Sequence, residues 1–102
     1  MPHLRPSKFL VHSEVAVGSG STVVLPESPG RVYVLLANDS DITIYIKING
    51  EDAEVSKGVP INADGGAYEL SIPAGNISGA RITAIHKGLK TKNLLVLEGH
   101  NR

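Results

Sequence analysis

The side chains that could do chemistry in this 102-residue chain are few and widely spaced. Cysteine is absent, which excludes disulfides, thiolate metal sites and cysteine nucleophiles. The four histidines stand at positions 3, 12, 86 and 100, without the H-x-H or H-E-x-x-H spacing of a metal site. No serine lies in a G-x-S-x-G elbow, so no hydrolase nucleophile can be nominated. The sequence therefore predicts a protein that is not an enzyme, with no catalytic residue, metal or cofactor.

Two histidines and two acidic clusters leave other interpretations open. His12 and His86 fall in predicted strands, where either could pair with a carboxylate as a metal ligand or general base. A hydrogen-bonded or exposed histidine is the favoured interpretation of both. The clusters at residues 39–41 and 51–54 carry the oxygen ligands that Ca²⁺ prefers, but neither has the twelve-residue calcium-loop pattern. We therefore expect solvated turns there.

The only basic patch is the stretch from His86 to Asn93, which contains Lys87, Lys90 and Lys92. It could meet an acidic protein surface or a phosphate backbone. No aromatic residue is interleaved with it, so a stacking platform for single strands is absent. Ten Lys and Arg balance ten Asp and Glu, whereas nucleic-acid-binding domains are usually strongly basic. The sequence thus argues against a nucleic-acid partner.

Charge is unevenly spread along the chain. Residues 27–69 hold eight acids and three bases, whereas residues 70–102 hold five bases and one acid. This asymmetry could reflect the placement of solvated loops. Alternatively, the acidic part of one copy could face the basic part of another.

The elements that must position these residues are short strands rich in isoleucine and valine and separated by Gly, Pro, Asn and Asp. No eleven-residue window keeps a helical apolar stripe without a Gly or Pro, and no apolar run approaches the roughly 20 residues of a membrane span. We expect a soluble, all-β fold: a single-domain β-sandwich or jelly-roll-like barrel of about seven to eight short strands. It would occupy residues 9–102, behind an extended N-terminal arm at residues 1–8. The predicted strands are 9–17, 22–25, 31–37, 42–48, 67–72, 81–86 and 94–98.

Two of these segments carry detailed expectations. Residues 42–48 alternate isoleucine with Thr, Tyr and Lys, which predicts one buried and one wet face. Asn49-Gly50 follows directly and is a strong hairpin signal, because both residues tolerate positive φ. Residues 31–37 are almost continuously apolar, which predicts a central strand buried on both faces.

Several short motifs follow one another along residues 22–99, and each alone is an ordinary strand or turn. They are Leu25-Pro26, Pro29-Gly30-Arg31-Val32, Leu35-Leu36-Ala37-Asn38-Asp39-Ser40, Ile44-Tyr45, Gly58-Val59-Pro60-Ile61, Gly65-Gly66-Ala67-Tyr68-Glu69-Leu70, Ile82-Thr83-Ala84-Ile85 and Leu95-Val96-Leu97-Glu98-Gly99. Their order resembles the small β-rich structural proteins encoded among the virion genes of tailed bacteriophages. The charged insert at 51–57 and the arm at 1–8 depart from the pattern, which leaves the position in the virion open.

The resemblance implies a capsid decoration (cement) protein, made in the host cytoplasm and located on the capsid surface. Its partner would be the major capsid protein of the same virion, bound through buried interface area, and a homotrimer on a local threefold axis is the simplest arrangement. A tail or fibre accessory, or a carbohydrate-binding adhesion module, is the alternative. The arm could add a strand to a neighbouring sheet edge. The predicted partner-binding residues are Pro2, His3, Leu4, Arg5, Pro6, Lys8, Lys87, Lys90 and Lys92.

Overall fold

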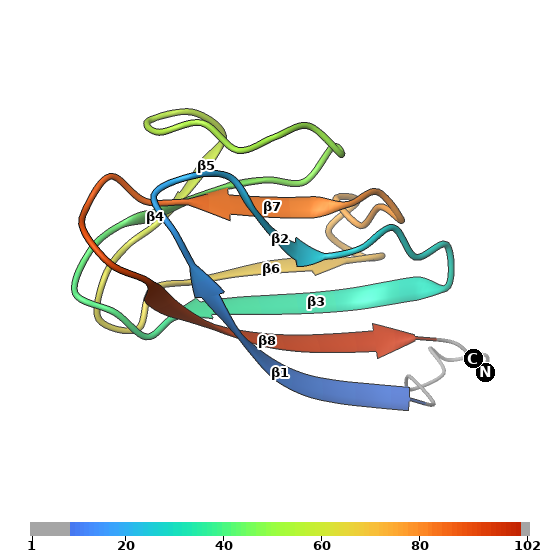
Figure 1. The fold of residues 1–102 in the computed structure, drawn as a ribbon. Helices are drawn as coiled ribbons and strands as arrows, with labels where there is room; N and C mark the ends of the chain where they lie inside the picture. The colour runs from blue at the N-terminus through green and yellow to red at the C-terminus, as the bar shows by residue number, and fades with distance from the viewer. Residues whose placement is uncertain (1–8, 101–102) are drawn as a thin grey trace, which may run out of the picture.

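The computed structural model describes residues 9–100, which form eight β-strands and no helix (Figure 1). Because this part of the chain contains no helix, it contains none that could span a membrane. The strands are β1 (Phe9–Val17), β2 (Thr22–Leu25), β3 (Arg31–Asn38), β4 (Ile44–Lys47), β5 (Val59–Ile61), β6 (Ala67–Ser71), β7 (Ile82–Ile85) and β8 (Lys92–His100). The predicted arm at residues 1–8 lies outside the described residues.

The strands form two antiparallel four-stranded sheets that pack into a sandwich. The order is β1-β8-β3-β6 in one, hereafter the β1 sheet, and β2-β7-β4-β5 in the other, the β2 sheet. Four of the strand pairs are nested in sequence: β1 with β8, β2 with β7, β3 with β6 and β4 with β5. This is a long double-stranded hairpin rolled onto itself, the topology of an eight-stranded jelly roll. The all-β prediction is confirmed.

The core lies between the sheets and is built from branched aliphatic side chains. On β3, Val34 and Leu36 point inward and are fully buried, and on β4 Ile44 and Ile46 do the same. Leu70, Ile82 and Leu94 complete the centre. Alternate residues of each strand supply this layer, as period-two patterning requires.

The alternation predicted for residues 42–48 is confirmed within β4, where Ile44 and Ile46 are buried and the residues between and after them are half-buried, but Ile42 and Ile48 lie outside the strand and are half-buried. The predicted hairpin turn at Asn49-Gly50 is wrong. Gly50 has φ +89°, whereas Asn49 is not in the left-handed region, so no two-residue primed turn forms. The backbone N–H of Gly50 instead donates to the carbonyl of Arg81. The Arg81 guanidinium in turn donates to the Gly50 carbonyl and to Asp52. These bonds attach the loop to the start of β7, and the chain returns only at β5.

The expectation that β3 is buried on both faces is also wrong. The strand is central, between β8 and β6, but only its inner face is covered by the second sheet. Tyr33, Leu35 and Ala37 on the outer face are half-buried. In a two-layer sandwich each sheet has one solvent-facing side, so a continuous apolar strand must place side chains outside.

Gly58 lies just before β5, and an alanine at this position should destabilise the fold. Its φ is +82°, and a Cβ there would collide with the backbone oxygen of Ile46. We expect Gly58→Ala to lower the free energy of unfolding by about 2–3 kcal/mol, because strain and overpacking add. Gly65→Ala is the matched control, since Gly65 has φ +98° with no atom within 4 Å of the added Cβ. Equal losses in urea denaturation would show that the contact with Ile46 contributes nothing.

Candidate assembly surface

The free edge of the β1 sheet is formed by β1, which pairs only with β8 among the described strands. The pairing runs without interruption from Phe9 opposite His100 to Val17 opposite Lys92. All residues from Leu10 to Glu14 are exposed, so both faces of this half of the strand meet solvent. Leu10 is 59% exposed and Val11 50%. β1 thus forms a long, regular edge of its sheet (Figure 1), and two of its apolar side chains are uncovered.

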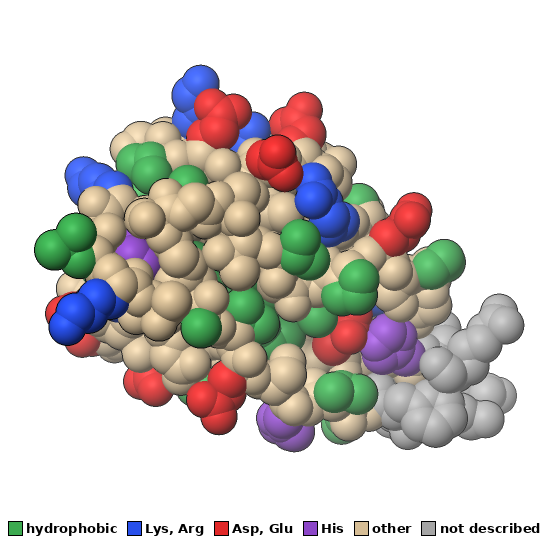
Figure 2. All heavy atoms as spheres, viewed as in Figure 1, with side chains coloured by type: hydrophobic (Ala, Val, Ile, Leu, Met, Phe, Trp, Pro, Cys, Tyr) green, Lys and Arg blue, Asp and Glu red, His purple; other side chains and the backbone are tan. Residues whose placement is uncertain are grey.

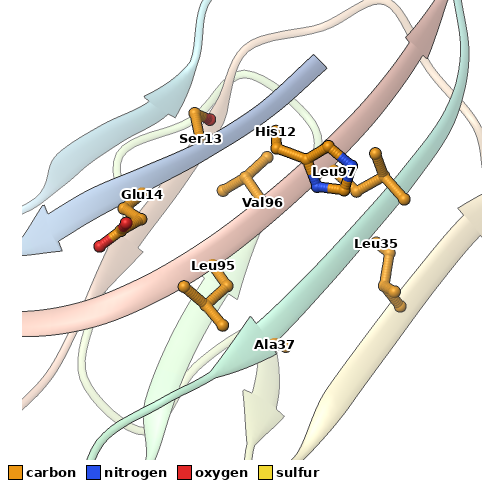
Figure 3. Close-up of a pocket in the computed structure, with 8 residues that line it drawn as sticks. All are labelled: His12, Ser13, Glu14, Leu35, Ala37, Leu95, Val96 and Leu97. Carbon is orange, nitrogen blue, oxygen red and sulfur yellow. The ribbon is translucent and has the colours of Figure 1, made fainter. Parts of the chain in front are cut away.

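Next to this edge, the outer face of the β1 sheet carries a shallow apolar groove of about 430 Å³. Leu95 and Leu97 of β8 form its floor with Leu35 and Ala37 of β3 (Figure 3). In the sheet register, Leu97 lies opposite Leu35 and Leu95 opposite Ala37, so the four side chains make two adjacent rows. Such a surface suits contact with another protein rather than a polar ligand.

The groove is bordered on both sides by groups that can be charged. On the β1 side, His12 lies opposite Leu97 and Glu14 opposite Leu95. On the β6 side, Glu69 accepts a hydrogen bond of 2.5 Å from the hydroxyl of Tyr33. That hydrogen bond, with smaller effects from burial and from the charge of Glu69, raises the pKa of Tyr33 above 10.0. The groove is therefore an apolar strip with a polar rim, the anatomy of a protein interface.

The largest buried polar network lies at the end of the sandwich where β8 finishes. The Arg31 Nε donates to Glu98 Oε2 at 2.7 Å. Its other nitrogens donate to the carbonyls of Ser78, Ala80 and Pro26. Arg31 is 4% exposed, so every donor named here is withdrawn from water and matched by a protein acceptor. The network joins β3 and β8 to two loops.

His100 extends this network, with Nε2 2.9 Å from Glu98 Oε1 and Nδ1 3.5 Å from Ser28 Oγ. Ser28, His100 and Glu98 contact one another in that order, as the three residues of a hydrolytic triad do. However, 3.5 Å is too long for the bond that would activate a serine, and Glu98 is already bound to Arg31. The cavity described above lies elsewhere, on the outer face. These contacts join the end of β8 to β3 and to the loop before it.

The environment of Glu98 gives acid sensitivity a definite sign. Burial raises the pKa of Glu98, but hydrogen bonds and charge from Arg31 and His100 outweigh it and place the pKa below 4.5. Because this pKa is lower in the folded than in the unfolded chain, the stabilisation is fully present above pH 4.5. It is lost as the pH falls through the folded value.

We expect the free energy of unfolding to decrease below about pH 4.5, and Glu98→Gln to flatten that decrease. Urea denaturation at a series of pH values from about 3 to about 7 measures the free energy of unfolding of both proteins as a function of pH. Asp41→Asn is the control. The pKa of Asp41 is also lowered, chiefly by its hydrogen bond from Lys92, but Asp41 is exposed whereas Glu98 is buried. If Glu98→Gln retained the full slope of the wild type, the sensitivity would belong to other groups.

The two strand histidines have the ordinary roles that we favoured. His12 is exposed on β1. His86 is fully buried just after β7, where its Nδ1 accepts the backbone N–H of Gly88 at 3.0 Å. Its Nε2 lies 3.0 Å from the Val17 carbonyl, which requires the proton on that nitrogen. His86 therefore joins the end of β1 to the β7–β8 turn.

The predicted partner-binding lysines lie in the β7–β8 turn and at the start of β8. Lys87 and Lys90 are exposed, and no ion pair within residues 9–100 involves either. Lys92 instead pairs with Asp41 at 2.9 Å. Lys92 lies opposite Val17, eight residues along β1 from Phe9, which is a separation of roughly 26 Å. The structure thus places the lysines at the opposite end of β1 from the residue that follows the arm. Pro2, His3, Leu4, Arg5, Pro6 and Lys8 lie outside the described residues.

The acidic clusters contact cations of the same chain. Glu51 and Glu54 both lie within 3.6 Å of the Lys47 ammonium, and Asp52 pairs with Arg81. A hydrogen bond from Asn49 and the contact with Lys47 lower the pKa of Glu51. Within residues 9–100, no three His, Asp or Glu side chains gather as a metal site would require. Arg81–Asp52 and Lys92–Asp41 also join the basic and acidic stretches inside one chain.

Sequence reasoning missed both the free edge and the apolar groove. The available signal was the pair of continuous apolar runs at residues 32–37 and 94–97, since a sandwich strand can bury only alternate residues. Comparisons with protein-family models, curated proteins and solved structures find no match for this chain. Any statement of function therefore depends on the surface itself.

Proposed function

We propose that this chain is a non-enzymatic structural protein that acts by binding other protein chains, and that it is a capsid decoration protein of a tailed bacteriophage. The observation that carries the proposal is the apolar groove of the β1 sheet beside a free nine-residue edge strand. An uncovered apolar strip with a polar rim gains free energy when a partner covers it.

The fold and the polar side chains are consistent with this role. Jelly rolls occur in viral capsid proteins, which supports the assignment by analogy alone. Within residues 9–100 the buried polar side chains are Arg31, Asn38, Thr83, His86 and Glu98. Glu98 is hydrogen-bonded to Arg31, and each of the other four is hydrogen-bonded to the backbone. Jelly rolls also occur in lectins, but Tyr33, Tyr45 and Tyr68 are all half-buried, which disfavours an aromatic sugar platform.

The partner would be the major capsid protein of the same virion, and the chain would lie on the capsid surface. Cement proteins bridge neighbouring shell subunits, so the relevant quantity is buried interface area. The groove would supply the apolar centre of that interface. The exposed lysines Lys87 and Lys90 could contact acidic groups at its periphery.

Co-sedimentation with empty shells of that capsid protein tests the proposal. We expect saturable binding of the wild-type chain. Binding of Leu95→Asp should be at least tenfold weaker, because Leu95 lines the groove. Val23→Asp is the matched control, because Val23 is similarly exposed but lies on the β2 sheet. Absence of wild-type binding would overturn the decoration role. Equal binding by both variants would overturn the assignment of the surface.

A further inference from the structure

The four sheet edges of the sandwich differ in how they are protected against pairing with another chain. At the edges of the β2 sheet, β2 has four residues with a register shift, and β5 has three residues with a proline at its centre. At the far edge of the β1 sheet, β6 has five residues. In contrast, β1 has nine residues without proline, lysine or bulge. Short strands, bulges and prolines are the usual means of blocking an edge, and β1 has none of them.

The first half of β1 is also the place where the sandwich is one layer thick. Leu10, His12 and Glu14 point to the outer face, and Val11 and Ser13 to the inner one, yet all five are exposed. A strand added along this edge would cover Leu10 and Val11 as well as satisfying the free backbone groups. The edge therefore offers both hydrogen bonds and apolar area to a partner strand.

We propose that β1 pairs antiparallel with β1 of a second copy of this chain, about a two-fold axis that passes through Ser13. In that register His12 of each copy lies opposite Glu14 of the other, which places opposite charges together when the histidine is protonated. Leu10 lies opposite Ala16, and Val11 opposite Val15. Each residue thus meets a partner of matching chemistry on its own face of the sheet.

Neighbouring registers lack this complementarity. A two-fold axis perpendicular to the sheet keeps each face continuous, so the register can shift only in steps that preserve the face. An axis through His12 would place the two histidines opposite each other and Leu10 opposite Glu14. An axis through Glu14 would place two carboxylates opposite each other, which is unfavourable. The sequence of β1 therefore selects the axis at Ser13.

The pairing would join two β1 sheets of four strands into one continuous sheet of eight. The groove on each copy begins at His12 and Glu14, so the two grooves would meet across the axis. In Figure 1 the first half of β1 lies at the lower margin of the molecule, where a second copy would add; Figure 2 shows the same side as a surface. The contact is isologous and closes on itself, so it gives a dimer, not the trimer that the phage resemblance implies. It does not depend on the capsid role.

Cysteine cross-linking tests the register directly, because the natural chain has no cysteine. Opposed residues of antiparallel strands have Cα atoms about 4.5–5.5 Å apart, which a disulfide can span. We expect Ser13→Cys to form a disulfide-linked dimer at least tenfold faster than Ser19→Cys, an exposed serine in the β1–β2 turn. His12→Cys should also be slow, since the two residues 12 would lie diagonally at about 7–8 Å. Equal rates for all three variants, or fastest linkage at position 12, would overturn the proposal.

Light scattering behind size exclusion provides the second measurement. Two chains of 10.8 kDa give about 22 kDa for the wild type. His12→Glu should shift the mass towards one chain, since it places two carboxylates opposite each other at each of two positions. The exchange variant His12→Glu/Glu14→His should restore the dimer because it restores the pairs. A wild-type mass of one or three chains, or an unchanged mass for His12→Glu, would contradict the pairing.

Discussion

Replacing Arg31 by leucine is expected to lower the free energy of unfolding by about 3–5 kcal/mol, the usual loss when one partner of a buried ion pair is removed. The variant would leave Glu98 nearly buried without its strongest partner. It would also remove the donor from the carbonyls of Pro26, Ser78 and Ala80. Urea denaturation at neutral pH measures the loss.

Two further variants separate the buried pair from a general effect of removing a cation. Lys92→Met breaks a pair with the exposed side chain of Asp41, and it should cost no more than about 1 kcal/mol. Adding Glu98→Leu to Arg31→Leu should recover part of the loss, because no unpaired carboxylate then remains. An Arg31→Leu variant as stable as Lys92→Met would show that the network adds little.

Asn38→Leu is expected to have the second largest effect, a loss of about 4 kcal/mol, because two backbone carbonyls and a serine hydroxyl each lose a hydrogen-bond partner at once. Asn38 is completely buried at the end of β3. Its Nδ2 donates to the carbonyls of Ile42 at 2.8 Å and Ile61 at 2.9 Å. Its Oδ1 accepts the hydroxyl of Ser40 at 2.6 Å. One amide thus holds the β3–β4 turn against the end of β5.

Asn62→Leu is the control for this prediction, because Asn62 is exposed in the turn that follows β5. We expect a change within about 0.5 kcal/mol there. Asn38→Asp should be destabilising as well, since a carboxylate cannot donate to either carbonyl. A loss below about 1 kcal/mol for Asn38→Leu would mean that water satisfies the carbonyls in its place.

The strands were predictable where apolar and β-branched segments are bounded by turn residues. Residues 9–17 and 22–25 form strands with the expected bounds, because Gly18-Ser19-Gly20-Ser21 separates them and Pro26 ends the second. β5 was missed because three residues with a central proline carry too little pattern. It exists because Ile44 and Ile46 of β4 hold it in register.

The polar interior was harder to predict than the strands. Arg31 begins one apolar run and Glu98 ends another, which was a signal that they pair, since charged residues are rarely buried alone. Their partnership spans 67 residues, and no local pattern reports it. The assembly surface was missed for a related reason. Which apolar side chains face out depends on the number of layers, which is a property of the whole fold.

The nested strand pairs have a consequence for the order in which the molecule closes. β4 and β5 are joined by residues 48–58, whereas β1 meets β8 across nearly the whole chain. Closing a longer loop costs more chain entropy before any contact repays it. We therefore expect folding to begin near β4 and β5 and to end when β1 docks. β1, the strand proposed to pair with another copy, is then also the last strand to fold and the first to unfold locally. Its amide protons should therefore exchange fastest until a partner strand covers them.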